Sequence, residues 1–217
     1  MSDFQPLDNV FDPPQVSTLA MQKAGDIGAT DNKDRLHTGL PNDFDDYYVM
    51  WRRKRITGVL GHTSNYKTGF MTYVAREAAK HLDASAGEIG LYCTWEDPVE
   101  DFALADIANM SQISVASIYG GGITPAERDE MISASIKRAA FPLWLVGHSE
   151  YINARRPSLT ISDIWQALEY MIDKQKKNVK YVMLDYLQQI SFADCKTRDM
   201  REGFVQIMTA VKSLTNA

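Results

Sequence analysis

The sequence has few cysteines, no excess of basic residues and no long apolar run. Only two of its 217 residues are cysteine, Cys93 and Cys195, which excludes a disulfide framework, and no Cys/His spacing is typical of zinc. Asp and Glu number 28 against 23 Lys and Arg, so the formal net charge is −5 and a surface that is basic throughout is excluded. No apolar run approaches the ~18 residues that span a membrane, and the N-terminal residues lack the basic and apolar regions of a signal peptide. We therefore expect a cytoplasmic protein with no membrane partner.

The chain divides into a polar N-terminal stretch and a longer patterned region. Residues 1–45 are interrupted by prolines and glycines, which predicts a linker or arm with one short helix near 15–23. Residues 46–217 alternate short apolar runs with stretches of helical periodicity, which predicts one α/β domain with a three-layer fold, a parallel sheet with helices on both faces. The expected strands are 56–60, 89–94, 143–146 and 181–184, and the expected helices are 68–81, 99–110, 125–138, 161–176 and 199–214.

The segment between the first expected strand and the first expected helix has the spacing of a phosphate-binding loop, or P-loop. In such a loop, backbone N–H groups and the N-terminus of the following helix face phosphate oxygens. Lys67 would reach the β and γ phosphates of ATP, and the hydroxyl of Thr68 would bind Mg²⁺. The alternative is a plain strand–turn–helix connection with an exposed lysine and threonine. The expected nucleotide-binding residues are Gly61, His62, Thr63, Ser64, Asn65, Tyr66, Lys67 and Thr68.

One residue of this loop departs from the usual pattern. The pattern has a second glycine directly before the lysine, and Tyr66 stands at that position. If the loop needs a positive φ there, a residue with a Cβ raises its free energy relative to glycine. We expect Tyr66 either to narrow the loop or to stack on the nucleotide, and in both cases to lower activity.

Two carboxylates follow expected strands and complete the groups that an ATPase needs. Hydrolysis requires one acidic group that holds the Mg²⁺ shell and another that orients or deprotonates the attacking water. Asp185 ends the last expected strand, a Walker B pattern, and Glu96 follows the second. We therefore expect Asp185 to be a metal ligand with Thr68, and Glu96 to be catalytic together with Lys67. Asp after a strand and Glu before a helix are also common without any function, so these alternatives stay open.

With these motifs the sequence resembles the RecA-like ATPase domain of replicative DNA helicases of the DnaB type, over residues 38–214. Residues 61–68 resemble its Walker A motif, and residues 38–45 resemble its lead-in to the first strand. Thr94-Trp95-Glu96-Asp97 resembles its Ser-Leu-Glu-Met segment, whose Glu is the catalytic base, and Leu184-Asp185-Tyr186-Leu187-Gln188 resembles its Walker B motif. The resemblance implies a RecA-like P-loop NTPase core that hydrolyses ATP with Mg²⁺, binds single-stranded DNA and works as a homo-oligomeric ring in DNA replication.

The sequence also differs from this family pattern beyond Tyr66. The primase-interacting domain of the family is not recognisable. The strand and arginine finger that follow in the family cannot be located, so we expect a fold that is truncated after the Walker B strand and its following helix. The DNA-binding loops of the family follow the Walker B strand, which makes Lys196, Arg198 and Arg201 candidates for DNA contact, with solvated loop charge as the alternative.

Three functions are compatible with these residues. The first is an ATP-driven helicase motor. The second is a nucleotide-binding loader or regulator with little turnover, which Tyr66 favours. The third is a RecA-fold ATPase of the recombination or clock type, and only the segment Asp185-Tyr186-Leu187-Gln188 argues against it.

Overall fold

The computed structural model describes residues 13–29, 36–41, 44–47, 55–62, 66–95, 97–151, 160–187, 190, 191, 193, 195 and 199–214. The chain forms two compact units, Met1–Arg35 and Leu36–Ala217, which are described separately. The first contains helix α1 (Pro13–Ala29), which is longer at both ends than the helix predicted at 15–23. Within the described ranges, no helix has both the length and the apolar character needed to cross a membrane. The domain boundary predicted after residue 45 stays a prediction.

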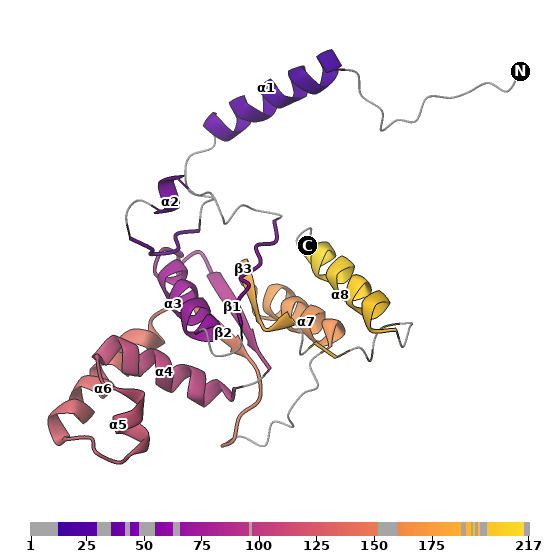
Figure 1. Ribbon diagram of the computed structural model, residues 1–217. Helices are drawn as coiled ribbons and strands as arrows, with labels where there is room; N and C mark the ends of the chain where they lie inside the picture. The colour runs from indigo at the N-terminus through magenta and orange to yellow at the C-terminus, as the bar shows by residue number, and fades with distance from the viewer. Residues whose placement is uncertain are drawn as a thin grey trace, which may run out of the picture. The chain divides into compact units, whose positions relative to one another are not determined.

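A parallel sheet lies at the centre of the second unit (Figure 1). Its strands among the described residues are β1 (Glu88–Thr94), β2 (Leu143–Val146) and β3 (Asn178–Asp185), in the order β2-β1-β3. The central strand β1 is buried from its second residue to its last, as expected for a parallel strand covered on both faces. The predicted α/β class, with a parallel sheet between helices, is therefore confirmed.

Helices precede and connect these strands. A threonine caps the N-terminus of two of them, Thr124 before α6 and Thr160 before α7. In each, the threonine side chain accepts a hydrogen bond from the backbone N–H of the third helical residue, and the acidic side chain of that residue, Glu127 or Asp163, accepts one from the backbone N–H of the threonine. The helices are α2 (Phe44–Tyr47), α3 (Lys67–Ala79), α4 (Val99–Ser111), α5 (Val115–Tyr119), α6 (Pro125–Ala139), α7 (Ile161–Glu169), which continues as a π-helical turn (Tyr170–Lys174), and α8 (Met200–Leu214).

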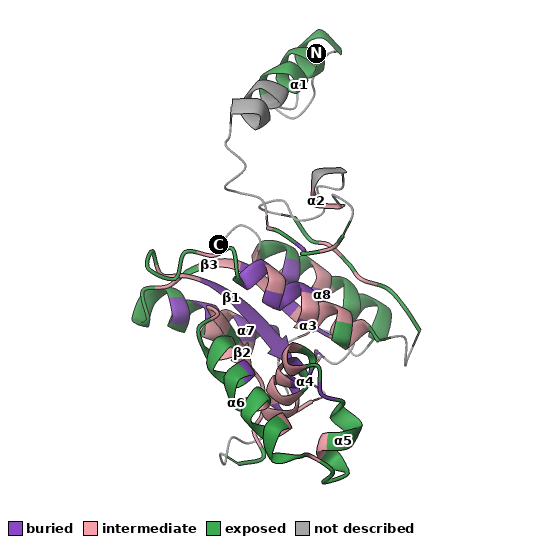
Figure 2. Ribbon diagram, turned by 90° about the vertical axis from the view of Figure 1, so that its left-hand side faces the viewer, coloured by how far each residue is buried: buried purple, intermediate pink, exposed green. Residues whose placement is uncertain are grey.

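One face of the sheet is covered by α3 (Figures 1 and 2). The hydroxyl of Tyr181, on β3, donates a hydrogen bond of 2.7 Å to the backbone carbonyl of Ala75 in this helix. The ring of Tyr181 lies against Gly90 of β1, where an added Cβ would clash with the ring. Glycine at this position therefore leaves the room that the Tyr181 ring occupies. The buried residues on this face are Val74, Ala75, Ala78, Tyr92, Phe102, Tyr181 and Met183.

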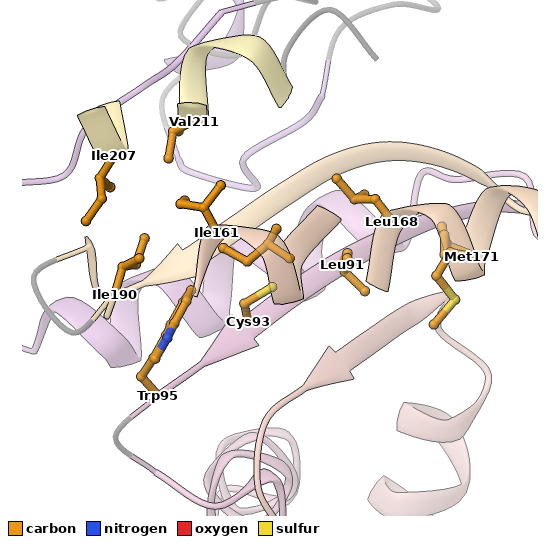
Figure 3. Packing of buried hydrophobic residues seen from close by; sticks show 11 residues of the cluster. Leu91, Cys93, Trp95, Ile161, Leu168, Met171, Ile190, Ile207 and Val211 are labelled. Carbon is orange, nitrogen blue, oxygen red and sulfur yellow. The ribbon is translucent and has the colours of Figure 1, made fainter. Parts of the chain in front are cut away.

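The opposite face is covered by α7 and α8 (Figure 3). Alternate residues of β1, Ile89, Leu91 and Cys93, point to this side, because successive side chains of a strand face opposite ways. Burial raises the pKa of the Cys93 thiol to about 12, so this cysteine acts as an apolar core residue. The buried partners of these strand residues are Trp95, Ile161, Ile164, Leu168, Met171, Ile190, Ile207 and Val211.

The strand predicted at residues 56–60 is wrong. This segment has no regular secondary structure, and Ile56 is 42% exposed and Leu60 93% exposed. The apolar run has the length of a strand, but a strand also needs a neighbour that pairs its backbone and a layer that covers its side chains. Within the described ranges β3 pairs only with β1, and Gly58 at the middle of the run adds no side chain to pack. In the part of the chain that the structure describes, the sheet therefore has three strands instead of the predicted four.

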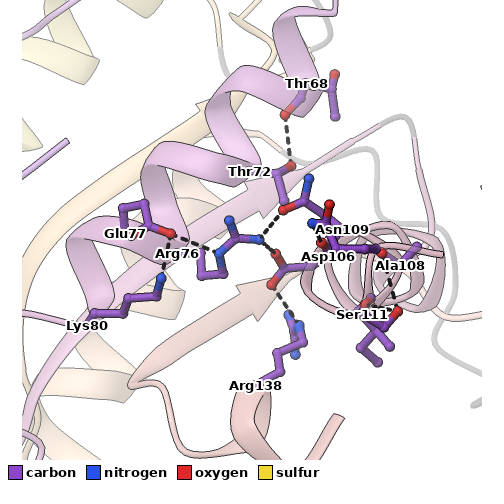
Figure 4. Close-up of polar contacts among 12 residues, drawn as sticks. Thr68, Thr72, Arg76, Glu77, Lys80, Asp106, Ala108, Asn109, Ser111 and Arg138 are labelled. Carbon is purple, nitrogen blue, oxygen red and sulfur yellow. Dashed lines mark hydrogen bonds and ion pairs between the residues drawn. The ribbon is translucent and has the colours of Figure 1, made fainter. Parts of the chain in front are cut away.

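A buried ionic network joins α3 to α4 and α6 (Figure 4). Asp106 of α4 is 1% exposed, and its carboxylate accepts hydrogen bonds from Arg76 at 2.7 Å and from Arg138 at 3.1 Å. Arg76 also donates to Asn109 at 3.0 Å and to Glu77 at 3.2 Å. Because charges at this depth have lost their water, the network favours this helix arrangement only while each charge keeps its partners.

Asp106 should therefore be among the most sensitive polar residues of the domain. Asp106→Ala leaves the buried guanidinium of Arg76 and the half-buried guanidinium of Arg138 without their shared carboxylate, so we expect the free energy of unfolding to fall by about 3–5 kcal/mol in urea denaturation. The matched control is Asp129→Ala on the exposed face of α6, which should change it by less than about 0.5 kcal/mol. A loss below about 1 kcal/mol for Asp106→Ala would show that water replaces the carboxylate.

Candidate functional site

The start of α3 has the features of an anion site. The helix begins at Lys67, and the residue before it, Tyr66, makes no side-chain hydrogen bond that caps the helix. The N–H groups of a first helical turn have no partner within the helix and carry partial positive charge. The side chain of Lys67 folds back along the loop, where its Nζ donates a hydrogen bond of 2.7 Å to the backbone carbonyl of His62. This places a cation and the positive end of the helix at one loop.

Tyr66 has a left-handed backbone, with φ 53° and ψ 28°. This position, where the loop pattern has glycine, therefore does require a positive φ, which costs a residue with a Cβ about 1 kcal/mol. The side chain of Tyr66 is 87% exposed, so contacts with the rest of the protein do little to offset that cost.

Asp185 lies at the last position of β3 and is buried. Its Oδ2 accepts a hydrogen bond of 2.7 Å from the hydroxyl of Tyr92, which is 0% exposed. Its backbone carbonyl accepts from the N–H of Trp95 at 3.2 Å, which extends the β1–β3 pairing by one step beyond Thr94. The carboxylate is thus held in one orientation at the carboxyl end of the sheet.

Asp185 and α3 belong to the same face of the sheet. Tyr92 and Tyr181 share the cluster beneath α3, and Asp185 follows Tyr181 and Met183 at alternate positions along β3. On α3, the hydroxyl of Thr72 donates a hydrogen bond of 2.8 Å to the backbone carbonyl of Thr68 (Figure 4). The fold therefore directs the start of α3 and the end of β3 to one side of the sheet.

The structure describes only some of the residues predicted for the site. Arg201 is exposed in the first turn of α8. Glu96 lies outside the described residues, although its neighbour Trp95 is buried beside the end of β3. The site assignments of all these residues stay predictions. The others outside the described ranges are Thr63, Ser64, Asn65, Lys196 and Arg198, and the described ones are Gly61, His62, Tyr66, Lys67, Thr68, Asp185 and Arg201.

Sequence reasoning missed Tyr92 and Thr72. In the sequence, Tyr92 looks like any other apolar residue in the run that predicts a buried strand. A tyrosine in the middle of a buried parallel strand is nevertheless a signal, because its hydroxyl must find a hydrogen-bond partner there. The carboxyl ends of neighbouring strands are the nearest source of such a partner.

The fold is that of RecA-like helicase domains. It is similar to the solved structure of an ATPase domain, with a TM-score of 0.64 and 16% identity, covering 94% of this chain and 68% of that one. It is also similar to a DnaB-like replicative helicase whose structure was determined with its interactions with primase, with a TM-score of 0.68 and 16% identity. That match covers 96% of this chain and 46% of the helicase, so the chain spans less than half of that protein.

The chain belongs to the DnaB-like helicase C terminal domain family, whose model matches residues 36–217. The predicted resemblance to the ATPase domain of DnaB-type helicases is thereby confirmed. No curated protein matches the chain.

The backbone of Tyr66 gives a prediction that is independent of any ligand. Tyr66→Gly removes an exposed side chain and the left-handed strain, so we expect the free energy of unfolding in urea to stay equal or rise by up to about 1 kcal/mol. The matched control is Glu130→Gly in the exposed middle of α6, which should lose about 1 kcal/mol, because glycine disfavours a helix. Equal losses for the two variants would mean that Tyr66 is not strained.

Proposed function

We propose that this domain binds ATP with Mg²⁺ at residues 61–68 and hydrolyses it to drive movement along, or unwinding of, DNA as part of a replicative helicase. The observation that carries the proposal is the pairing of a cationic helix start, at Lys67, with an oriented buried carboxylate, Asp185, on the same face of the sheet. Membership of the DnaB-like helicase C terminal domain family supports the same chemistry.

The residues fit a magnesium nucleotide. The contact of Lys67 with the carbonyl of His62 is a single exchangeable hydrogen bond, and a phosphate oxygen would make a stronger, charge-assisted one. The hydroxyl of Thr68 and the carboxylate of Asp185 are oxygen ligands of the kind that Mg²⁺ prefers. When bound, Mg²⁺ supplies charge neutralisation at the β and γ phosphate oxygens.

Each residue then has a defined task. Gly61 to Thr68 would wrap the phosphates with backbone N–H groups, while Lys67 binds their terminal oxygens. Glu96 would orient the attacking water and accept its proton. Lys196, Arg198 and Arg201 would contact the phosphates of single-stranded DNA, and such contacts weaken as salt rises.

We further propose that the domain works in a homo-oligomeric ring, in which a neighbouring copy completes each ATP site. In related phosphoryl-transfer enzymes, an arginine supplied by a partner raises the rate of turnover by about 10³-fold or more. We therefore expect the isolated domain to bind nucleotide but to hydrolyse it slowly.

The strained Tyr66 favours a second candidate, a nucleotide-binding loader or regulator with little turnover. Single-turnover hydrolysis of ATP, with and without single-stranded DNA, separates the two functions. Stimulation by DNA supports the motor, and equal slow hydrolysis in both conditions supports the regulator.

Nucleotide binding is tested first at Lys67. Lys67→Ala removes the cation assigned to the β and γ phosphates, so we expect the Kd for a fluorescent ATP analogue to rise by about 10-fold or more. Lys137→Ala, at the exposed end of α6, is the control for the loss of one positive charge and should leave the Kd unchanged. If Lys67→Ala is folded and binds as tightly as the wild type, these residues are not a phosphate loop.

Turnover is tested at Glu96. Glu96→Gln keeps the shape of the side chain but removes the base, so the Kd for ATP should change by no more than a few-fold while hydrolysis falls by about 10²-fold or more. Titration with the fluorescent ATP analogue gives the Kd, and rapid-quench measurement of a single turnover gives the rate of hydrolysis, for the wild type and the variant. If the variant hydrolyses ATP at the wild-type rate, Glu96 only contributes negative charge at the start of the helix, and another residue is the base.

A further inference from the structure

Tyr92 is the polar group most deeply buried next to the candidate site. It lies in the central strand β1, it is 0% exposed, and its ring packs on Phe102 with the ring centroids 4.5 Å apart. Phenylalanine would fill this space equally well. The hydroxyl adds one specific contact, the 2.7 Å hydrogen bond that it donates to Oδ2 of Asp185.

The hydroxyl of Tyr92 is the donor in this bond, because the oxygens of an ionised carboxylate only accept hydrogen bonds. Because a hydroxyl that donates to a carboxylate forms a charge-assisted bond, the bond is strong enough to hold the carboxylate in one rotamer.

The ring of Tyr92 belongs to the cluster beneath α3, with Val74 and Ala75 of that helix. On the same helix, the hydroxyl of Thr72 donates to the backbone carbonyl of Thr68, the residue that would supply a hydroxyl to Mg²⁺. Tyr92 therefore packs against the helix that carries Thr68 and bonds to the carboxylate at the end of β3, and the proposed function assigns both of these groups to the metal.

We propose that Tyr92 is a positioning residue for the metal site: it holds Oδ2 of Asp185, so that the other carboxylate oxygen is presented to Mg²⁺ at the start of α3. The inference rests on the proposed function, because it concerns the same site. Hydrogen bonds to a metal-binding side chain typically change metal affinity by about 10–100-fold when they are removed. Tyr92 would therefore set the Mg²⁺ requirement of nucleotide binding without touching either the metal or the nucleotide.

The test is a Mg²⁺ titration of ATP-analogue binding by Tyr92→Phe. We expect the Mg²⁺ concentration for half-maximal binding to rise by about 10-fold or more, while binding of the analogue in EDTA stays as in the wild type. The matched control is Tyr181→Phe, which also removes a buried tyrosine hydroxyl beneath α3, one bonded to Ala75 and not to Asp185. A purely structural role predicts similar losses of Tm and unchanged Mg²⁺ requirements for both variants, and that result overturns the proposal.

Asp185→Asn separates this inference from the proposed function. If this variant does not raise the Mg²⁺ requirement, the proposed metal site itself fails. If it does raise the requirement and Tyr92→Phe does not, the metal site stands and the role of Tyr92 is refuted. In the double variant, Tyr92→Phe should add no further shift, because its effect passes through the carboxylate.

A second measurement covers the case in which Tyr92→Phe is only partly folded. The same Mg²⁺ titration is made in sucrose, which favours the folded state, with the wild type in the same solution as the reference. An unchanged Mg²⁺ requirement under these conditions would overturn the proposal in the same way.

Discussion

The seating of α3 on the sheet is the constraint on which the rest of the structure depends. Two polar contacts fix this position: the hydroxyl of Tyr181, on the sheet, donates to the carbonyl of Ala75, and Asp106 of α4 binds Arg76. Both contacts are buried, so a shift of the helix along its axis would leave the phenol of Tyr181 without a partner and would break the pair between Asp106 and Arg76. Each such group costs on the order of 1–3 kcal/mol or more, which makes one register of the helix far better than its neighbours.

That register determines where the chemistry of the candidate site can take place. Once α3 is fixed, its first turn lies at a set position relative to β3, and the register of β3 is fixed by its pairing with β1, in which Asp185 lies opposite Thr94. The N–H of Trp95 continues this pairing to Asp185, so the chain that leads to Glu96 leaves the sheet beside the carboxylate. The core and the site are thus fixed by the same contacts.

The sequence predicted those features that depend on local pattern. The apolar runs of β1, β2 and β3 and the helical periodicity of α6 and α7 are short-range signals, and the elements formed where they indicated. The segment 56–60 has the same local signal, but among the described residues no strand pairs with it and no layer covers it, and a run of five residues cannot reveal either lack. The bond between Tyr92 and Asp185 was missed for a related reason, since it joins residues that only the folded sheet brings together. Within the candidate site, therefore, residue types could be predicted and their contacts could not.

The two halves of the candidate site differ in how firmly they are held. Asp185 and Tyr92 are buried and bonded to each other, whereas Tyr66 is exposed in a backbone conformation that disfavours it. A ring that narrowed the loop would be covered by loop atoms, so its exposure favours stacking on a ligand as its role. Stacking of an aromatic ring on a base contributes on the order of 1–3 kcal/mol, which is enough to offset the strain of a left-handed tyrosine. Under the proposed function, the rigid carboxylate of Asp185 would orient the metal, and the strained, exposed ring of Tyr66 would stabilise the loop only when nucleotide is bound.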